Sequence, residues 1–119
     1  MSKMAMAFPI LPGKTAGWRT WIEELHGARQ EEFAESRRRA GLHEQTFLQH
    51  APTGDLVIVT VEGEDPRQAF ERMVSQNDPF MTWFRSRAKE FHGVDLSKPM
   101  RDVTSELVID SAAMAATPA

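Results

Sequence analysis

The chain has 119 residues, of which 41% are hydrophobic and 26% are charged, a composition typical of one globular domain. Its formal net charge of -3 gives no overall positive field for nucleic acid or an anionic membrane, so we expect neither as a partner. The sequence contains no cysteine, which excludes disulfides, thiolate metal ligands and cysteine nucleophiles.

The first predicted element is a strand in the apolar run 4–11, which ends at the turn signal Pro12-Gly13. Pro9 has no backbone N–H, so this strand should lie at an edge of its sheet or carry an irregularity at that residue. The N-terminal run is too short and interrupted for a signal peptide, and no stretch approaches the ~20 apolar residues that span a membrane. We therefore expect a cytoplasmic protein.

A long helix follows, with Thr15 as its expected N-cap and Gly41 at the left-handed position that ends it. Gly27 is expected to kink it. The arginines at 37–39 stand in the last turn, where positive charge complements the helix dipole. Glutamates three and four residues earlier can pair with them, so we expect a solvated face rather than a nucleic-acid site.

One side of this helix is apolar in its first half and carries polar residues in its second half. At 100° per residue, that side carries Trp18, Ile22, Leu25, Arg29, Glu32, Ser36 and Ala40. Polar groups facing a sheet must be paired or wet, so Arg29, Glu32 and Ser36 are candidate pocket residues, and Arg29 and Ser36 candidate catalytic ones. The alternative is that Gly27 shifts the helical phase, which turns these residues to solvent and leaves Phe33 to pack alone.

Segments 45–50 and 56–61 flank the loop signal Pro52-Thr53-Gly54-Asp55 and predict a β-hairpin. Glu44 and Gln49 are polar candidates for the inner layer of the sheet. Gln49 shares a face with Phe47, which makes it the better candidate for binding a substrate.

The strand 56–61 is apolar on both faces. Val57, Val59 and Val61 point one way, and Leu56 and Ile58 point the other. Helices can cover only one of these faces, so we expect a homodimer that joins its sheets face to face. The alternative is a central strand that tolerates a few exposed β-branched residues.

Asp65-Pro66 and Asp78-Pro79 each combine an N-cap with proline at the first helical position. They predict a second helix broken near 75–78 and ended by Gly93. Trp83 belongs to an aromatic stripe that is either core or the wall of a ligand pocket. His92, at the helix end, is either a cationic C-terminal residue favoured by the dipole or a general base.

A last strand is predicted at 103–109, followed by a flexible tail at 111–119. The order is then βαββαβ, a single ferredoxin-like α+β domain over 1–110. Right-handed crossovers place both helices on one face of a four-stranded antiparallel sheet. The four histidines show no His-x-x-x-His spacing, so we expect no metal site.

Four segments carry a family resemblance: 8–14 (FPILPGK), 35–41 (ESRRRAG), 79–84 (PFMTWF) and 91–96 (FHGVDL). With them the chain resembles the dimeric α+β-barrel superfamily, which includes the antibiotic-biosynthesis monooxygenases, and within it an uncharacterised group of short bacterial proteins. The resemblance implies the barrel-like dimer and a pocket between sheet and helices. It carries no catalytic residue over to this sequence.

These observations favour a small-molecule enzyme without cofactor, of the monooxygenase or isomerase type, with a substrate site drawn from Arg29, Glu32, Ser36, Gln49 and Trp83. His92 joins Arg29 and Ser36 as a catalytic candidate. The alternative is a non-catalytic dimer that binds a metabolite or is purely structural. Haem binding is conceivable in this superfamily, but the sequence offers only an unpartnered histidine for it.

Overall fold

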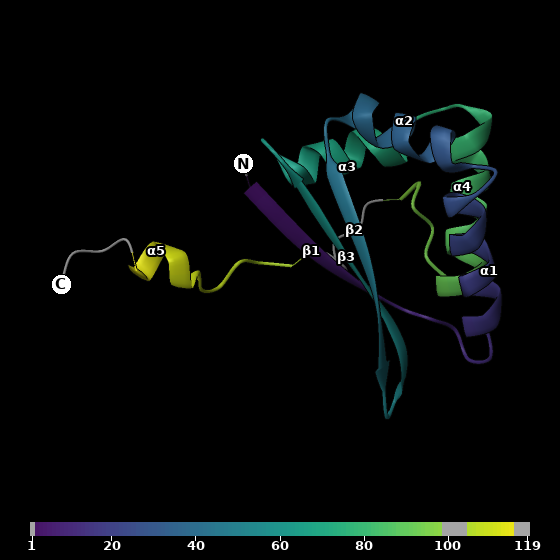
Figure 1. Ribbon diagram of the computed structural model, residues 1–119, viewed down its shortest axis with the longest axis horizontal. Helices are drawn as coiled ribbons and strands as arrows, with labels where there is room; N and C mark the ends of the chain where they lie inside the picture. The colour runs from purple at the N-terminus through teal and green to yellow at the C-terminus, as the bar shows by residue number, and fades with distance from the viewer. Residues whose placement is uncertain (1, 99–104, 116–119) are drawn as a thin grey trace.

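The computed structural model describes residues 2–98 and 105–115. Its sheet is antiparallel in the order β1-β3-β2, with β1 (Ser2–Pro9) and β2 (His43–Ala51) at the edges and β3 (Gly54–Gly63) between them (Figure 1). The position of β1 confirms that the proline-containing strand lies at an edge.

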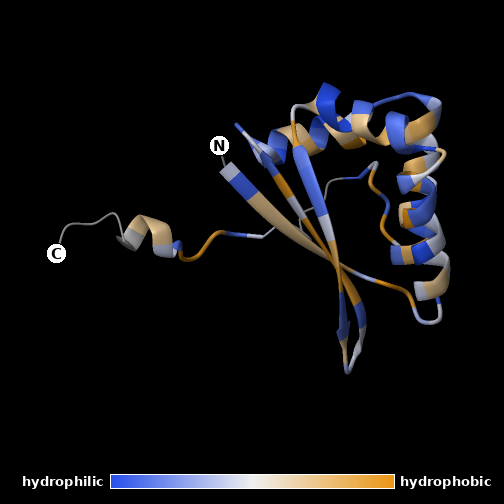
Figure 2. Cartoon of the chain, in the orientation of Figure 1, coloured by the Kyte–Doolittle hydropathy of each residue, from blue (hydrophilic) through white to orange (hydrophobic). Residues whose placement is uncertain are grey.

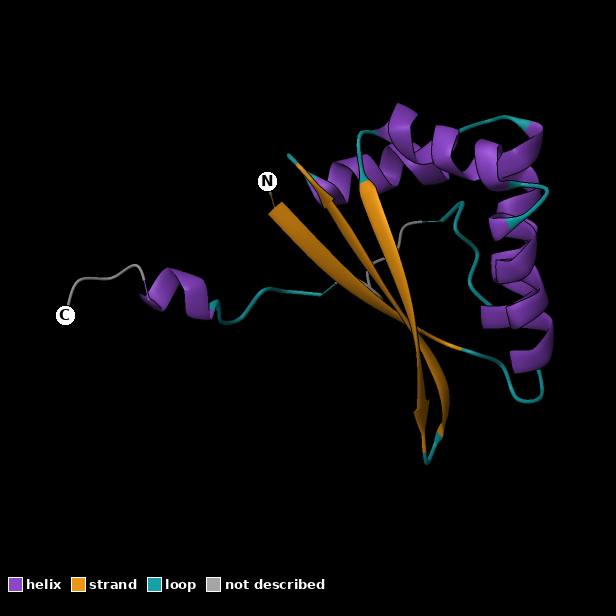
Figure 3. Cartoon of the chain, in the orientation of Figure 1, coloured by secondary structure: helices purple, strands orange, loops and turns teal. Residues whose placement is uncertain are grey.

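Helices α1 (Thr15–His26), α2 (Gln30–Ala40), α3 (Pro66–Val74) and α4 (Pro79–His92) gather on one side of the sheet (Figure 3). A short helix, α5 (Ser111–Ala115), lies on the opposite side, within the segment predicted as a flexible tail. The fold is therefore α+β, as the sequence predicts. Among the described residues, no helix is both long enough and apolar enough to cross a membrane.

The second predicted helix is indeed two helices, each begun by an aspartate. Asp65 accepts a hydrogen bond from the Gln68 backbone N–H at 3.1 Å, and Asp78 accepts one from the Met81 N–H at 2.9 Å. Both side chains satisfy donors that the first helical turn leaves free. Helix α4 ends at His92, and Gly93 follows it in the left-handed conformation with φ of 70°, so the predicted bounds of this region are confirmed.

The first predicted helix is also two helices, not one kinked helix. The chain turns at Gly27, whose N–H bonds the carbonyls of Glu23 and Glu24, and α2 then runs in a different direction from α1 (Figure 1). Lys14, not Thr15, is the N-cap residue of α1. The Thr15 hydroxyl is instead only 2.6 Å from Asp55 Oδ2 of β3, to which it donates its hydrogen bond.

The two-faced strand is confirmed. Val57 and Val61 of β3 are buried beneath the helices, together with Met4 and Met6 of β1. The side chains that alternate with these point away from the helices. A row on this outer face runs across the sheet through Ala7, Ile58 and Phe47, which are direct register partners.

The prediction of a fourth strand at 103–109 is wrong for the residues of this segment that the structure describes. Residues 105–110 have no regular structure, and positions 103 and 104 lie outside the described residues. The Ser105 hydroxyl accepts from the Ala5 N–H at 3.1 Å and also contacts the Ala5 carbonyl oxygen, so a side chain meets the free edge of β1. Within the described residues the sheet has three strands, and the apolar segment 105–110 leads away from the domain instead of pairing with it (Figure 2).

Candidate functional site

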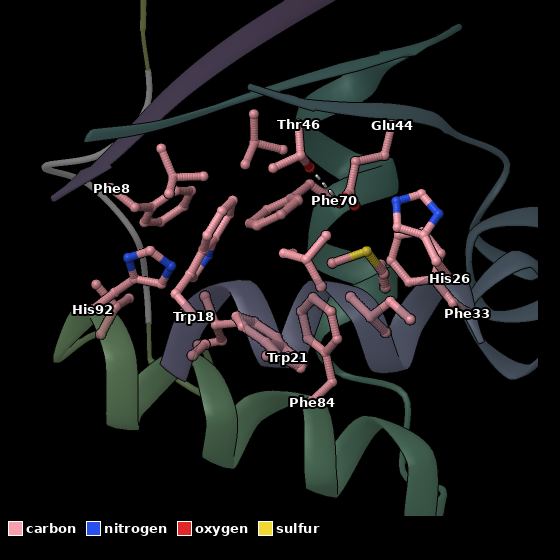
Figure 4. A pocket seen from close by; sticks show the side chains of 18 of the residues that line it. Phe8, Trp18, Trp21, His26, Phe33, Glu44, Thr46, Phe70, Phe84 and His92 are labelled. Carbon is pink, nitrogen blue, oxygen red and sulfur yellow. Dashed lines mark hydrogen bonds between the residues drawn. The ribbon is translucent and has the colours of Figure 1, made fainter. Parts of the chain in front are cut away.

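A cavity of about 420 Å³ lies between the inner face of the sheet and the helices (Figure 4). The sheet lines it with Phe8, Glu44, Thr46, Val57 and Val59. The helices line it with Trp18, Trp21, Ile22, Leu25, His26, Gln30, Phe33, Ala34, Phe70, Met73, Phe84, Ala88 and His92, and the segment after α4 adds Val94 and Leu96. Its middle is apolar, and polar side chains stand towards its two ends.

Aromatic rings form the floor of the cavity on the helix side. The Trp21 ring lies 5.0 Å from that of Phe84 and 5.9 Å from that of Phe91, measured between centroids, which joins α1 to α4. These ring contacts hold α1 and α4 at a fixed distance from each other on this side of the cavity. The indole N–H of Trp21 is buried, and no described residue accepts a hydrogen bond from it. Buried donors are usually paired, so this N–H is a donor that an acceptor placed in the cavity would satisfy.

One end of the cavity is formed by His92 together with Phe8 (Figure 4). His92 is the last residue of α4, and its Nδ1 lies 2.9 Å from the carbonyl oxygen of Pro9. A carbonyl can only accept, so Nδ1 carries the proton, and the neutral ring keeps a lone pair on Nε2. Among the described residues, none forms a hydrogen bond with Nε2.

Burial lowers the pKa of His92 below its usual value of 6.5, and the hydrogen bond to Pro9 opposes that change only in part. The neutral imidazole is therefore the favoured form at neutral pH. This corrects one of the two interpretations of the sequence, in which the helix dipole favours the cation. Desolvation has this effect because the half-buried ring packs between Phe8, with a centroid distance of 5.7 Å, and Trp21.

The other end of the cavity contains an ion pair. Arg37 Nε donates to Glu44 Oε1 at 2.9 Å, and only 6% and 7% of the two side chains are exposed. The second carboxylate oxygen of Glu44 accepts from the Thr46 hydroxyl at 3.3 Å. Glu44 and Thr46 both line the cavity, so this end presents a hydroxyl and a carboxylate whose charge is paired with Arg37.

The guanidinium of Arg37 is held on several sides. Its carbon lies 4.2 Å from the centre of the Phe33 ring and 4.4 Å from that of Phe84, and Nη1 donates to Ser36 Oγ at 2.7 Å. Nη2 is buried without a partner among the described residues. The prediction of a solvated arginine cluster is therefore wrong for Arg37, because a carboxylate on β2 and two aromatic faces replace its water.

None of the five residues predicted to bind substrate is in the cavity lining formed by the described residues, whereas the catalytic candidate His92 and the inner-layer candidate Glu44 both are. Arg29 and Glu32 pair with each other at 3.4 Å on the surface, and the Arg29 guanidinium covers the Trp83 ring at 4.2 Å. The phase shift at Gly27 explains this placement. A substrate-binding role for these three residues stays a prediction.

Ser36 and Gln49 also differ from expectation in their surroundings. Ser36 is fully buried, and its hydroxyl is used by the Phe33 carbonyl and by Arg37. Gln49 does share a face with Phe47, but that face is the outer one, and Phe47 is 52% exposed. The assignment of Gln49 to the inner layer is wrong because an aromatic neighbour does not by itself identify the buried face.

Thr46 and the role of Arg37 are absent from the sequence-based predictions, in which Glu44 stands below Gln49. A usable signal was present, because Glu44, Thr46 and Leu48 alternate on one face of the hairpin. In the observed register these three residues lie opposite Val61, Val59 and Val57, the apolar face of β3. Pairing the two strands before choosing the inner face identifies them.

No group of three or more histidine, aspartate or glutamate side chains suited to a metal ion occurs within residues 2–98 and 105–115. No protein-family model and no curated protein matches the chain.

Proposed function

We propose that the cavity binds a flat, largely apolar small molecule with polar substituents at both ends, and that His92 acts on it as a general base. The observation that carries this proposal is the fixed tautomer of His92, whose Nδ1 is bonded to the Pro9 carbonyl. Nε2 of this neutral imidazole has no hydrogen-bond partner among the described residues, and it lies at the end of an aromatic cavity, where it can accept a proton.

The dimensions and lining of the cavity support this class of ligand. About 420 Å³ falls in the range of ordinary small-molecule sites, which are mostly apolar with a few placed polar groups. Trp18, Trp21 and Phe84 provide faces for an aromatic body. A hydrogen-bond donor on the ligand suits the Glu44 carboxylate at the far end, and an acceptor suits the Trp21 N–H.

Proton abstraction alone is sufficient for two reactions. In an isomerisation, Nε2 of His92 takes a proton from one carbon and returns it to another, with no change in oxidation state. In a monooxygenation, deprotonation of an activated CH₂ group gives a carbanion that reduces O₂ itself; CH₂ and O₂ become C=O and H₂O. The substrate supplies the electrons, which is the cofactor-independent activity implied by the resemblance to the antibiotic-biosynthesis monooxygenases.

The alternative is a non-catalytic protein that binds a metabolite in the same cavity. The buried Trp21 N–H, which no described residue accepts from, favours a bound ligand whether or not a reaction follows. In that case the role of His92 is limited to a hydrogen bond, and its basicity is unimportant.

A thermal-shift screen followed by turnover assays tests the proposal. The probes are hydroxylated naphthalenes and anthrones, with unsubstituted naphthalene for comparison. Polar probes should raise the melting temperature, because a ligand that binds the folded state stabilises it by mass action. Consumption of O₂ or rearrangement of the bound probe then identifies the reaction.

His92→Gln separates catalysis from binding, and His43→Gln, at an exposed position of β2, is the matched control. Loss of the base should lower turnover by ~10²–10⁴-fold with little change in the thermal shift. Equal turnover in wild type and His92→Gln removes the proposed base. Binding without any turnover favours the alternative, and no shift with any probe overturns the cavity as a ligand site.

A further inference from the structure

We propose that residues 105–110 form an exchange arm that adds as a strand to the free edge of β1 in a second copy of this chain. The inference is independent of the cavity and its chemistry. It rests on three features of the structure: an apolar segment outside the domain, an open strand edge, and an uncovered sheet face on the same side.

The arm is apolar and almost fully exposed. Leu107, Val108 and Ile109 have 74%, 83% and 66% of their surfaces accessible. The arm leaves the sheet on the side away from α1 to α4, where Figure 2 shows its hydrophobic colour against open solvent. Three adjacent residues of this kind favour a β-strand, and an exposed apolar patch usually marks a contact surface.

The edge of β1 offers the matching backbone groups. The N–H and C=O of Ala5 point away from β3, since the Ser105 side chain contacts both. Strand geometry repeats every second residue, so the backbone groups of Lys3 and Ala7 face the same free edge. Strand edges of this kind pair with added strands, and among the described residues Ser105 is the one that forms hydrogen bonds with this edge.

The outer face of the sheet adds the second surface. Ala7, Ile58 and Phe47 form a row across β1, β3 and β2, and no helix among the described residues covers them. A two-fold axis beside this face allows each copy to donate its arm to the other while the two apolar rows meet. A second copy therefore fits both features at once, in agreement with the face-to-face dimer expected from the sequence.

Mass measurement of the full chain by light scattering is the first test. Wild type should have the mass of two chains at micromolar concentration, and Val108→Asp should have the mass of one. Glu106→Gln, a change of charge in the same arm, should leave two chains. A monomeric wild type overturns the proposal, as does a Val108→Asp variant that stays dimeric.

Disulfide trapping then distinguishes pairing of the arm with β1 of a second copy from pairing with β1 of its own chain. Because the sequence has no cysteine, only the introduced cysteines can form disulfides. Ala7→Cys protein is mixed with protein that carries a single cysteine at 107, 108 or 109, and the mixture is oxidised. At least one mixture should give a covalent heterodimer, because paired strands bring Cα atoms within ~4.4–6.8 Å.

Thr20→Cys, on the helix side of the molecule, is the control and should not cross-link to the arm. Chains that carry both Ala7→Cys and an arm cysteine test whether the arm pairs with β1 of its own chain. If these close a disulfide within one chain and the mixtures of single variants do not cross-link, the arm pairs with its own β1 and the exchange is wrong. An absence of cross-links in every combination also overturns it.

Discussion

The two ends of the cavity hold polar groups in different ways. At one end, the ion pair of Arg37 and Glu44 is bonded to neighbouring side chains and enclosed by two aromatic rings. At the other end, His92 bonds the Pro9 carbonyl through Nδ1, and no residue in the described part of the chain bonds its Nε2. The first arrangement serves to hold α2 against β2, whereas the second leaves a reactive atom available. Perturbing each end should therefore affect stability and chemistry differently.

Removal of the charge at the ion-pair end should have the largest effect. Arg37→Met leaves the buried Glu44 carboxylate without its cation, which should lower the free energy of unfolding by about 3–5 kcal/mol in urea titrations. Arg37→Met/Glu44→Met should recover much of this loss, because no uncompensated charge remains. Equal destabilisation of the single and double variants contradicts the ion-pair interpretation.

The spacing between α1 and α4 should be the next most sensitive feature. A Cβ on Gly17 meets Cε1 of Phe91 at 2.7 Å, and Phe91 stacks on Trp21 in the cavity floor. Gly17→Ala should therefore lower the free energy of unfolding by about 1–3 kcal/mol through overpacking, despite the better helix propensity of alanine. Thr20→Ala, exposed on the same helix, provides the comparison in thermal unfolding and should differ little from wild type.

The pH dependence of stability should report the free base at the His92 end. Burial lowers the folded-state pKa of His92, so below about pH 6.5 the unfolded chain binds a proton that the folded chain resists. The stability of wild type relative to His92→Gln should therefore be greatest above pH 6.5. It should decline as the pH falls through that value towards the folded-state pKa, as measured by unfolding at each pH.

A constant difference between the two proteins from pH 7.5 to 5 contradicts the lowered pKa. His43→Gln, at an exposed site, serves as the control for titration of a surface histidine.

Substitution of Arg29, which lies outside the cavity, should have the smallest effect on stability and on probe binding. Its contacts are a surface ion pair with Glu32 and a cation–π contact with Trp83. Arg29→Ala should lower the free energy of unfolding by at most about 1 kcal/mol and leave probe binding unchanged. A large loss of probe affinity instead supports the binding role that the sequence predicts for Arg29.

Much of the local architecture could be predicted from the sequence because its signals lie within a few residues of each other. The aspartate–proline pairs at 65–66 and 78–79 identify helix starts, and Gly93 identifies an end. Alternation in β3 correctly divided the valines from Leu56 and Ile58. Of the catalytic candidates, His92 lines the cavity. Its position at a helix end could be predicted because Gly93, the signal for that end, is the next residue in the sequence.

The tertiary structure decided which side of each element is buried and which partners meet. Phe47 and Gln49 share a face, but only the pairing with β3 shows that it is the outer face. Arg37 is buried because Glu44 approaches from another element, and no spacing within the helix encodes that approach. Leu107 to Ile109 have strand propensity, yet pairing requires an edge, and edges form only when distant segments come together.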